Sequence, residues 1–256
     1  MTQSNKWFVS PQEKPEADSH IFLFPYAGGG PAVFSKWSAD LPVNIEAHIA
    51  HYPGRGSRHN ETPIKSLLTM VDELSQAIQP FLDKPFAFFG HSLGGMLSFE
   101  LARGLRKKGF PQPGILFISA CGAPHIPDPH PMIHALPEGE FINSLEELNG
   151  IPQEILKNQE ILNLLLPVLR ADFELLETYK YTSDEPLDSP ILVFGGLDDK
   201  RINQERLEGW AMHTSAKFES RYFAGNHFFI NTARKSVIES IIGEITSVAT
   251  LHRNEG

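Results

Sequence analysis

A serine with a glycine two residues to either side is the first feature of this sequence that could carry chemistry. It lies in Gly90-His91-Ser92-Leu93-Gly94, after an apolar run at residues 86–89 and before a helix-like run at residues 96–105. A strand, a Gly-x-Ser-x-Gly turn and a helix together predict a nucleophile elbow, which projects the serine Oγ from the edge of a sheet. Glycines suit such a turn because side chains there would collide with neighbouring backbone. We predict Ser92 as a nucleophile, the alternative being a glycine-rich turn with an idle serine.

A serine hydroxyl needs an adjacent base to take its proton, and His227 is our candidate for that base. It follows a predicted strand, lies in a glycine turn and comes after both Ser92 and an acidic pair. Ser…Asp…His is the chain order of the fold that carries such an elbow. The chain has 11 histidines, so the presence of a histidine does not by itself indicate a catalytic base. The rivals are weaker, because His91 points away from where a base must lie and His51 precedes the serine.

A carboxylate must hold the imidazole in the correct tautomer and stabilise its cation. Asp198 and Asp199 compete for this role, since both follow the predicted strand at residues 191–194. Counting Gly-x-x-Asp from Gly196 favours Asp199, and the apolar Ile202 then falls three positions on. Asp198 remains the alternative.

Two backbone N–H groups are predicted to stabilise the oxyanion of a tetrahedral intermediate. One belongs to Leu93, which follows the nucleophile at the positive end of a helix dipole. The other belongs to Ala27, in the loop Tyr26-Ala27-Gly28-Gly29-Gly30 after the apolar run at residues 21–24. Glycines such as Gly28 let a backbone approach a ligand closely. The alternatives are a flexible glycine turn and a phosphate-binding loop, although the latter's G-x-G-x-x-G and G-K-[ST] patterns are missing here.

The elements that must position these residues alternate between strands and helices. Short apolar runs without alternation are typical of central parallel strands that are covered on both faces. We therefore predict an α/β fold with a mostly parallel central sheet flanked by helices. The strands are predicted at residues 21–24, 45–51, 86–89, 115–119, 191–194 and 218–223, and the helices at residues 32–40, 67–82, 96–105, 139–148, 154–157, 160–179, 204–213 and 233–251.

One long segment interrupts this alternation with helices alone. We predict a single domain over residues 1–256, with its core at 18–123 and 186–251 and an inserted helical lid at 124–185. The proline-rich stretch at 124–131 is expected to act as a stiff hinge, and Pro167 to kink the last lid helix. The leucine-rich face of that helix is expected to line an acyl tunnel over the site. Ordinary bundle packing of the same leucines is the alternative.

The composition argues against several classes of partner. The chain carries 22 Lys and Arg against 31 Asp and Glu, a formal net charge of −9, which disfavours nucleic acid and an anionic membrane surface. The single cysteine, Cys121, allows no intrachain disulfide, and we interpret it as core packing rather than as a nucleophile. The polar start at residues 1–19 does not resemble a signal peptide, and no window could span a membrane. We expect a cytoplasmic monomer without a metal site.

Together these motifs resemble those of type II thioesterases, stand-alone editing enzymes associated with nonribosomal peptide and polyketide synthetases, which have the α/β-hydrolase fold. The similarity spans residues 20 to about 245. The matching stretches are Phe24-Pro25-Tyr26-Ala27-Gly28-Gly29, Tyr52-Pro53-Gly54-Arg55-Gly56, Phe89-Gly90-His91-Ser92-Leu93-Gly94-Gly95, Gly195-Gly196-Leu197-Asp198-Asp199 and Gly225-Asn226-His227-Phe228-Phe229. The family's loop alanine corresponds to Ala27 and its catalytic aspartate to Asp199. The chain departs from the family at Asn226, where glycine is usual, and at Ser57, where an acidic residue is common.

The resemblance implies hydrolysis of acyl thioesters on the phosphopantetheine arm of acyl or peptidyl carrier protein domains. The enzyme itself would need no cofactor, because the substrate carries the phosphopantetheine. The alternatives on the same fold are a small-molecule carboxylesterase or lipase, an acyltransferase, and a non-catalytic ligand-binding relative.

Several cations bear on how an acidic chain could dock an acidic carrier. Lys200 and Arg201 beside the acidic pair, and Lys180 at the end of the predicted lid, are our candidates. The cluster at Arg106 lies about 20 Å from the serine end of its helix, at 1.5 Å of rise per residue, and we interpret it as a solvated helix end. The arginines of the Tyr52–Arg58 loop are interpreted as structural, with contact to an anionic part of a substrate as the alternative.

Overall fold

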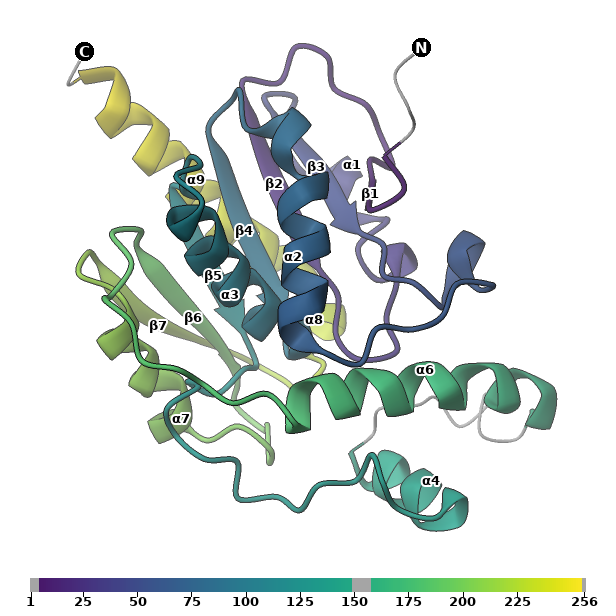
Figure 1. Ribbon diagram of the computed structural model, residues 1–256. Helices are drawn as coiled ribbons and strands as arrows, with labels where there is room; N and C mark the ends of the chain where they lie inside the picture. The colour runs from purple at the N-terminus through teal and green to yellow at the C-terminus, as the bar shows by residue number, and fades with distance from the viewer. Residues whose placement is uncertain (1–4, 149–157, 255–256) are drawn as a thin grey trace.

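Seven strands form one sheet in this computed structural model, which describes residues 5–148 and 158–254, with side chains described to residue 247. The order across the sheet is β1-β3-β2-β4-β5-β6-β7 (Figure 1). The strands are β1 (Phe8–Val9), β2 (Ser19–Phe24), β3 (Ile45–Ala50), β4 (Phe86–His91), β5 (Ile115–Ser119), β6 (Ile191–Gly196) and β7 (Phe218–Phe223). All six predicted strands are present, with ends shifted by at most two residues.

The strand that leads to Ser92 lies near the middle of the sheet. β4 pairs with β2 on one side and with β5 on the other, both in parallel. Every residue of these three strands is buried, which explains their apolar runs. Only β1 is antiparallel, against β3, among the strands described. The predicted mostly parallel sheet is confirmed. We did not predict β1, because two residues show no periodicity.

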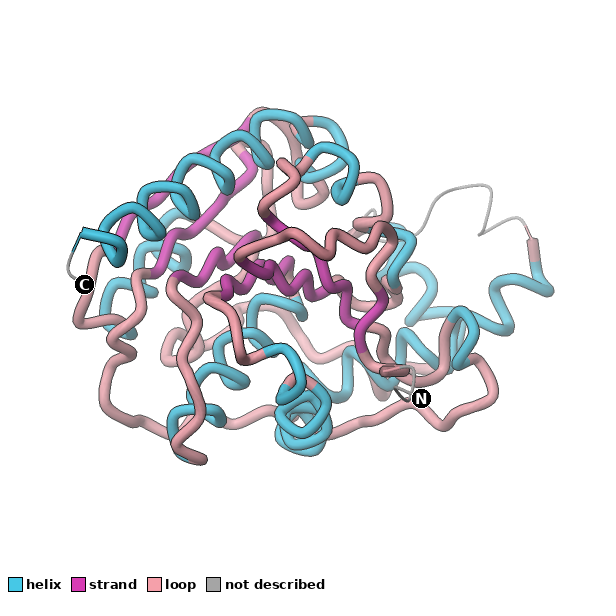
Figure 2. Tube along the Cα trace, turned by 90° about the horizontal axis from the view of Figure 1, so that it is seen from above, coloured by secondary structure: helices cyan, strands magenta, loops and turns pink. Residues whose placement is uncertain are grey.

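Helices cover both faces of the sheet, as Figure 2 shows. On one face α2 and α3 bury Leu74 and Leu97 in the same apolar cluster as Phe88, and on the other α1 and α9 bury Trp37 and Ile241. None of the helices in the described chain is long and apolar enough to cross a membrane. The α-helices are α1 (Trp37–Asp40), α2 (Leu67–Ala77), α3 (Leu93–Lys107), α4 (Glu138–Glu147), α6 (Gln159–Glu177), α7 (Gln204–Glu208), α8 (Phe229–Thr232) and α9 (Arg234–Asn254), and the 3-10 helices are η1 (Pro31–Val33), η2 (Gly56–Arg58), η3 (Gln79–Phe81) and η4 (Gly209–His213).

Three predicted helices are shorter and less regular than expected. The prediction at 32–40 corresponds to η1 and the single turn of α1, that at 67–82 to α2 and η3, and that at 204–213 to α7 and η4. In the second case Pro80 has no N–H to donate, so the α-helical hydrogen bonds end before it. The predicted helix at 154–157 lies outside the described residues.

Residues 124–185, which we call the helical insertion, contain α4 and α6 and no strand in their described part. Figure 1 shows both helices below the sheet, beside the ends of the central strands. Pro167 lies within α6, as the sequence indicated. The insertion has an apolar cluster of its own, formed by Ile133, Phe141, Leu145, Leu162, Leu166, Leu169 and Phe173. The apolar side chains that recur along these helices therefore pack against one another. The division into core and lid stays a prediction.

Candidate active site

Ser92 occupies a strained turn between β4 and α3. Its φ of 55° and ψ of −116° are unusual for a residue with a side chain, and it is the N-cap of α3. A Cβ on Gly90 would lie 2.1 Å from the carbonyl oxygen of Gly94, and a Cβ on Gly94 would lie 1.9 Å from that of Phe24. Both glycines are therefore required by close backbone approach. The turn is further held by the N–H of Ser92, which donates to the carbonyl of Ser119 at 2.8 Å.

Asp199, rather than Asp198, is the carboxylate that lies against His227. Its Oδ2 is 2.8 Å from Nδ1 of the imidazole, and its side chain is 1% exposed, whereas Asp198 is exposed. Its Oδ1 accepts the N–H groups of Arg201 and Ile202 at 2.8 and 3.2 Å. Burial alone would raise the pKa of Asp199, but the His227 contact and these N–H groups lower it overall. The carboxylate is therefore ionised and its orientation is fixed.

The two rival histidines have other contacts. His91 is fully buried, its Nδ1 lies 2.8 Å from Oγ of Ser119, and burial holds its pKa well below the usual value. His51 is buried as well, and its Nε2 lies 2.9 Å from the carbonyl of Arg55. The ring of His91 therefore bonds to the end of β5, and that of His51 to the loop after β3. Neither lines the cavity at Ser92.

The loop after β2 lies at the same site, because Ala27 and Ser92 line one cavity. Gly28 has a φ of 76°, which favours glycine, and the N–H of Gly29 closes a turn on the carbonyl of Tyr26 at 2.8 Å. Among the described residues, neither the N–H of Ala27 nor that of Leu93 has a hydrogen-bond acceptor. These are the two donors that the sequence predicted for an oxyanion.

Ser92 lies where two cavities meet. The larger has a volume of about 560 Å³ and the smaller about 350 Å³. The residues common to both linings are Ser92, His130, Leu176 and Arg201. The larger cavity is also lined by Ala27, Asp199 and His227, and by apolar side chains of the helical insertion, Leu145, Leu148, Leu169, Phe173 and Leu176. The structure therefore brings Ala27, Ser92, Asp199 and His227 to one cavity beneath the insertion, whereas Leu93 lines neither cavity.

Asp172 is a residue of this site that sequence reasoning missed. It lies on α6, lines the larger cavity and forms a buried ion pair with Arg55 at 2.7 Å. The available signal was a charged residue on the apolar face of an amphipathic helix, between Leu169 and Phe173. Arg55 and Arg58 both have structural contacts, since Arg58 pairs with Glu61 and donates to the carbonyl of His51.

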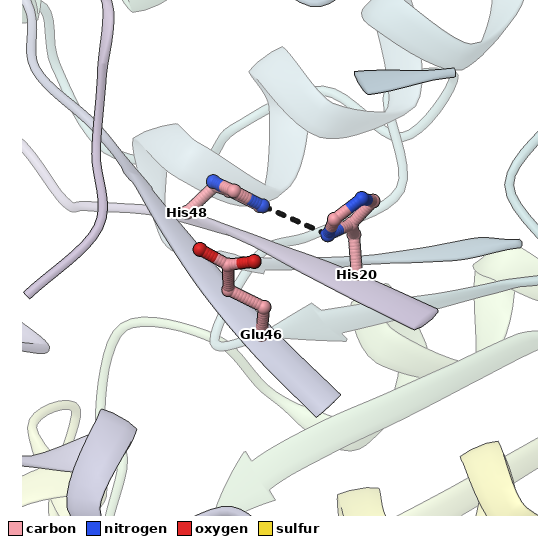
Figure 3. Close-up of side chains that lie close together, drawn as sticks. All are labelled: His20, Glu46 and His48. Atoms are coloured by element: carbon pink, nitrogen blue, oxygen red, sulfur yellow. Dashed lines mark hydrogen bonds between the residues drawn. The ribbon is translucent and has the colours of Figure 1, made fainter. Parts of the chain in front are cut away.

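A second cluster of titratable groups lies on β2 and β3, away from this cavity (Figure 3). Nε2 of His48 is 2.9 Å from Nδ1 of His20, Oγ of Ser10 is 2.8 Å from Nδ1 of His48, and Glu46 lies beside both rings. The ligand-type atoms of the two histidines and Glu46 lie within 4.8 Å of one another. Burial lowers the pKa of both imidazoles, and the nearby Lys84 cation lowers it further. The facing nitrogens already bond to each other and Lys84 opposes a second cation, so we interpret the cluster as a buried hydrogen-bond chain.

Comparison with known proteins agrees with this geometry. The Thioesterase domain family model matches residues 19–245. Two relatives are each 40% identical: linear gramicidin dehydrogenase LgrE of Brevibacillus parabrevis, over 98% of this chain and 97% of that protein, and gramicidin S biosynthesis protein GrsT of Aneurinibacillus migulanus, over 97% of each. The solved structure of the type II thioesterase BorB from the borrelidin biosynthetic cluster is 29% identical, with a TM-score of 0.86 over 95% of this chain and 99% of that one.

The name of the first relative refers to a dehydrogenase, whereas the family model that matches this chain is that of the thioesterase domain. The glycine loop after β2, Gly28-Gly29-Gly30-Pro31, lacks the G-x-G-x-x-G spacing of dinucleotide-binding dehydrogenases. The family match covers nearly the whole sheet and the elbow, and the resemblance predicted from the motifs is confirmed. The chain therefore belongs to the thioesterase family and is a type II thioesterase, a serine hydrolase with the α/β-hydrolase fold.

Proposed function

We propose that this enzyme hydrolyses acyl thioesters from the phosphopantetheine arm of carrier proteins in nonribosomal peptide or polyketide synthesis. The observation that carries the proposal is the 560 Å³ cavity, which joins Ser92, His227 and Asp199 to an apolar lining from the helical insertion. The gramicidin S and borrelidin systems named for two similar proteins support the pathway class. We assign this enzyme the editing of misacylated carriers, the role that the resemblance to type II thioesterases implies.

The proposed reaction proceeds through an acyl-enzyme. His227 takes the proton of Ser92 Oγ as the oxygen attacks the thioester carbon, and the N–H groups of Ala27 and Leu93 stabilise the oxyanion. The C–S bond then breaks, and the thiolate leaves with the proton from His227. Water, deprotonated by His227, attacks the acyl-serine and releases the acid and free Ser92. Asp199 keeps the histidine proton on Nδ1, which directs Nε2 to the reacting groups.

The two cavities at Ser92 suit a substrate that extends to both sides of its reacting carbon. We assign the acyl chain to the larger cavity, because leucine and phenylalanine side chains line it, and the pantetheine arm to the smaller. The side chains named above and water suffice for this chemistry, so we propose no cofactor. We also propose that the enzyme acts as a cytoplasmic monomer, and size-exclusion chromatography with light scattering tests its oligomeric state.

The decisive experiment is mass spectrometry of an acyl-carrier panel incubated with wild type and with Ser92→Ala. We expect wild type to release free holo-carrier from several acyl-carriers and Ser92→Ala to release none. Intact acyl-carriers in both samples would contradict the proposed substrate. Rates on acyl-pantetheine and on p-nitrophenyl esters separate a thioesterase from a carboxylesterase or lipase, and addition of amine or alcohol acceptors reveals an acyltransferase. A fluorophosphonate that fails to label Ser92 would point to a non-catalytic relative.

A carrier must also be held at the mouth of the site. Arg201 lines both cavities, including the smaller one that we assign to the pantetheine arm, and Lys200 beside it is exposed, so we propose that they contact the acidic carrier. The guanidinium of Arg201 lies 5.8 Å from the ring centre of Phe173, which links this edge to the insertion. Lys180 is exposed but does not line either cavity, so its contribution is expected to be smaller.

A further inference from the structure

A buried ion pair joins the helical insertion to the loop after β3, and both of its members bond to the glycine loop that carries Ala27. Asp172 of α6 is 1% exposed and Arg55, in the loop after β3, is 7% exposed. Oδ1 of Asp172 accepts from Nη2 of Arg55 at 2.8 Å, and Oδ2 accepts from Nη1 at 2.7 Å. The same Nη1 donates to the carbonyl of Gly29 at 3.0 Å. A bidentate pair of this kind fixes orientation as well as charge.

The carboxylate also holds the backbone of the glycine loop directly. Its Oδ2 accepts the N–H of Gly28 at 2.7 Å. A Cβ on Gly28 would lie 2.6 Å from Cδ2 of Leu169, so α6 packs against this loop at a second point. The N–H of Gly28 belongs to the peptide next to the one that carries the N–H of Ala27. Helix α6 therefore sets the position of the Ala27 donor through its immediate neighbour.

The charges of the pair matter as much as its geometry. Asp172 lines the cavity at Ser92, and an unpaired carboxylate there would oppose the negative charge that develops on the oxyanion. Arg55 neutralises the carboxylate through two hydrogen bonds. Asp172 can therefore accept the N–H of Gly28 without adding net negative charge to the site.

We propose that Asp172 is a positioning residue: through Gly28 it holds the N–H of Ala27 where the oxyanion forms, with Arg55 as its charge partner. The inference rests on the proposed function, because it assigns Ala27 to the oxyanion hole. Asp172 itself touches neither the nucleophile nor the base in this arrangement. It acts on a group that binds the transition state more strongly than the substrate, so its loss should lower kcat more than it raises KM.

Asp172→Asn tests the proposal against Glu174→Gln as a matched control. The asparagine is nearly the same size but loses the charged bidentate contact with Arg55, which fixes the orientation of the oxygen that holds Gly28. The control residue, Glu174, lies on the same helix as Asp172. Its substitution breaks the 3.0 Å ion pair with Lys65, which does not involve the glycine loop. We expect Asp172→Asn to lower kcat about 10- to 100-fold with KM within about threefold, and Glu174→Gln to change kcat less than twofold. Wild-type kcat in folded Asp172→Asn, or equal losses in both variants, would overturn the proposal.

A double variant separates positioning from stability. Arg55→Met with Asp172→Leu replaces the pair with apolar side chains of similar size, an exchange that often preserves stability. We expect its Tm to stay near that of wild type while kcat remains at least about tenfold low, because no carboxylate holds Gly28. Recovery of kcat together with Tm would assign the pair to stability alone. This variant also decides the question if Asp172→Asn does not fold.

The labelling rate of Ser92 by a fluorophosphonate distinguishes this inference from the proposed function. Labelling needs the nucleophile and the oxyanion donors but no carrier or acyl chain. If wild type is labelled at Ser92 but hydrolyses no acyl-carrier, the proposed substrate is wrong and the positioning role is decided by labelling alone. Slower labelling of Asp172→Asn than of Glu174→Gln supports that role, and equal rates contradict it.

Discussion

Nδ1 of His227 lies 2.8 Å from Oδ2 of Asp199, 28 residues earlier in the chain. The imidazole proton is therefore on the nitrogen that faces the carboxylate, and the other nitrogen is available as a base. Two backbone N–H groups bond the second oxygen of Asp199, so the carboxylate cannot rotate without losing them. The geometry of the base is thus set by the short loop after β6.

Replacing this carboxylate tests its role directly. We expect Asp199→Asn to lower kcat by a factor on the order of 10³ to 10⁴, because an amide can stabilise the wrong tautomer and cannot stabilise the imidazolium. Asp198→Asn is the control, since that side chain is exposed and should change kcat less than about threefold. Steady-state rates on a small acyl thioester give both values. An equal loss in the two variants would falsify the choice of Asp199.

The glycine spacing of the elbow makes a second prediction. Gly94→Ala would place a Cβ 1.9 Å from the backbone oxygen of Phe24, so we expect little folded protein or a large fall in Tm. Gly139→Ala in α4 meets nothing within 4 Å and should be neutral or stabilising by up to about 1 kcal/mol. Thermal unfolding followed by circular dichroism compares the two. A Gly94→Ala protein with wild-type Tm would contradict the close approach of α3 to β2.

The buried histidine chain on β2 and β3 predicts how stability depends on pH. Burial, followed by the charges of His20 and Lys84, lowers the pKa of His48 to about 3 from 6.5. Below about pH 6.5 the unfolded chain binds a proton at His48 that the native state does not bind. As the pH is lowered from about 6.5 to about 3, this residue should therefore decrease the free energy of unfolding by about 1.4 kcal/mol per pH unit.

Urea unfolding of His48→Gln at several pH values between 4 and 7 measures this contribution. We expect the variant to show a shallower loss of stability on acidification than wild type. His59→Gln, at an exposed position, should keep the wild-type slope. Identical slopes in all three proteins would show that His48 titrates alike in the folded and unfolded states.

Carrier docking can be separated from chemistry by charge reversal. Lys200→Glu with Arg201→Glu should raise KM for an acyl-carrier about tenfold and leave KM for a small acyl thioester nearly unchanged, because only the carrier needs these cations. Lys107→Glu, at the far end of α3, is the control and should affect neither substrate. Equal effects on both substrates would mean that the pair acts on the site itself.

Motion of the insertion should be confined to part of it. Leu169 and Asp172 tie the second half of α6 to the glycine loop, whereas no such tie holds α4 to that loop in the described structure. With residues 124–131 as the hinge, we expect an acyl ligand to change amide hydrogen exchange at 138–148 and 159–166 but not at 168–177. Unchanged exchange over 138–177 would count against a moving lid, and a change at 168–177 against a fixed α6.

Much of this protein was determined by local sequence. The strands that carry the site are apolar runs because both faces of the sheet are covered. The elbow can be recognised from its sequence because the tight turn at Ser92 admits only glycine at positions 90 and 94. The order of serine, acidic pair and histidine also follows from the sequence. The strand and elbow patterns depend on residues within a few positions of one another, so they can be recognised in the sequence without knowledge of the fold.

The tertiary structure decided which way side chains point and which residues from distant parts of the chain come into contact. The sequence favoured Asp199 over Asp198 only by its position after Gly196, and the turn after β6 decides between them, because it buries Asp199 against His227 and exposes Asp198. The pairing of β1 with β3 joins two residues to a distant strand and leaves no periodicity to detect. Arg55 and Asp172 are 117 residues apart, and each is an ordinary charged side chain until folding removes both from water. Which charges share a buried site is therefore a property of the fold, because burial and pairing arise only when separate segments meet.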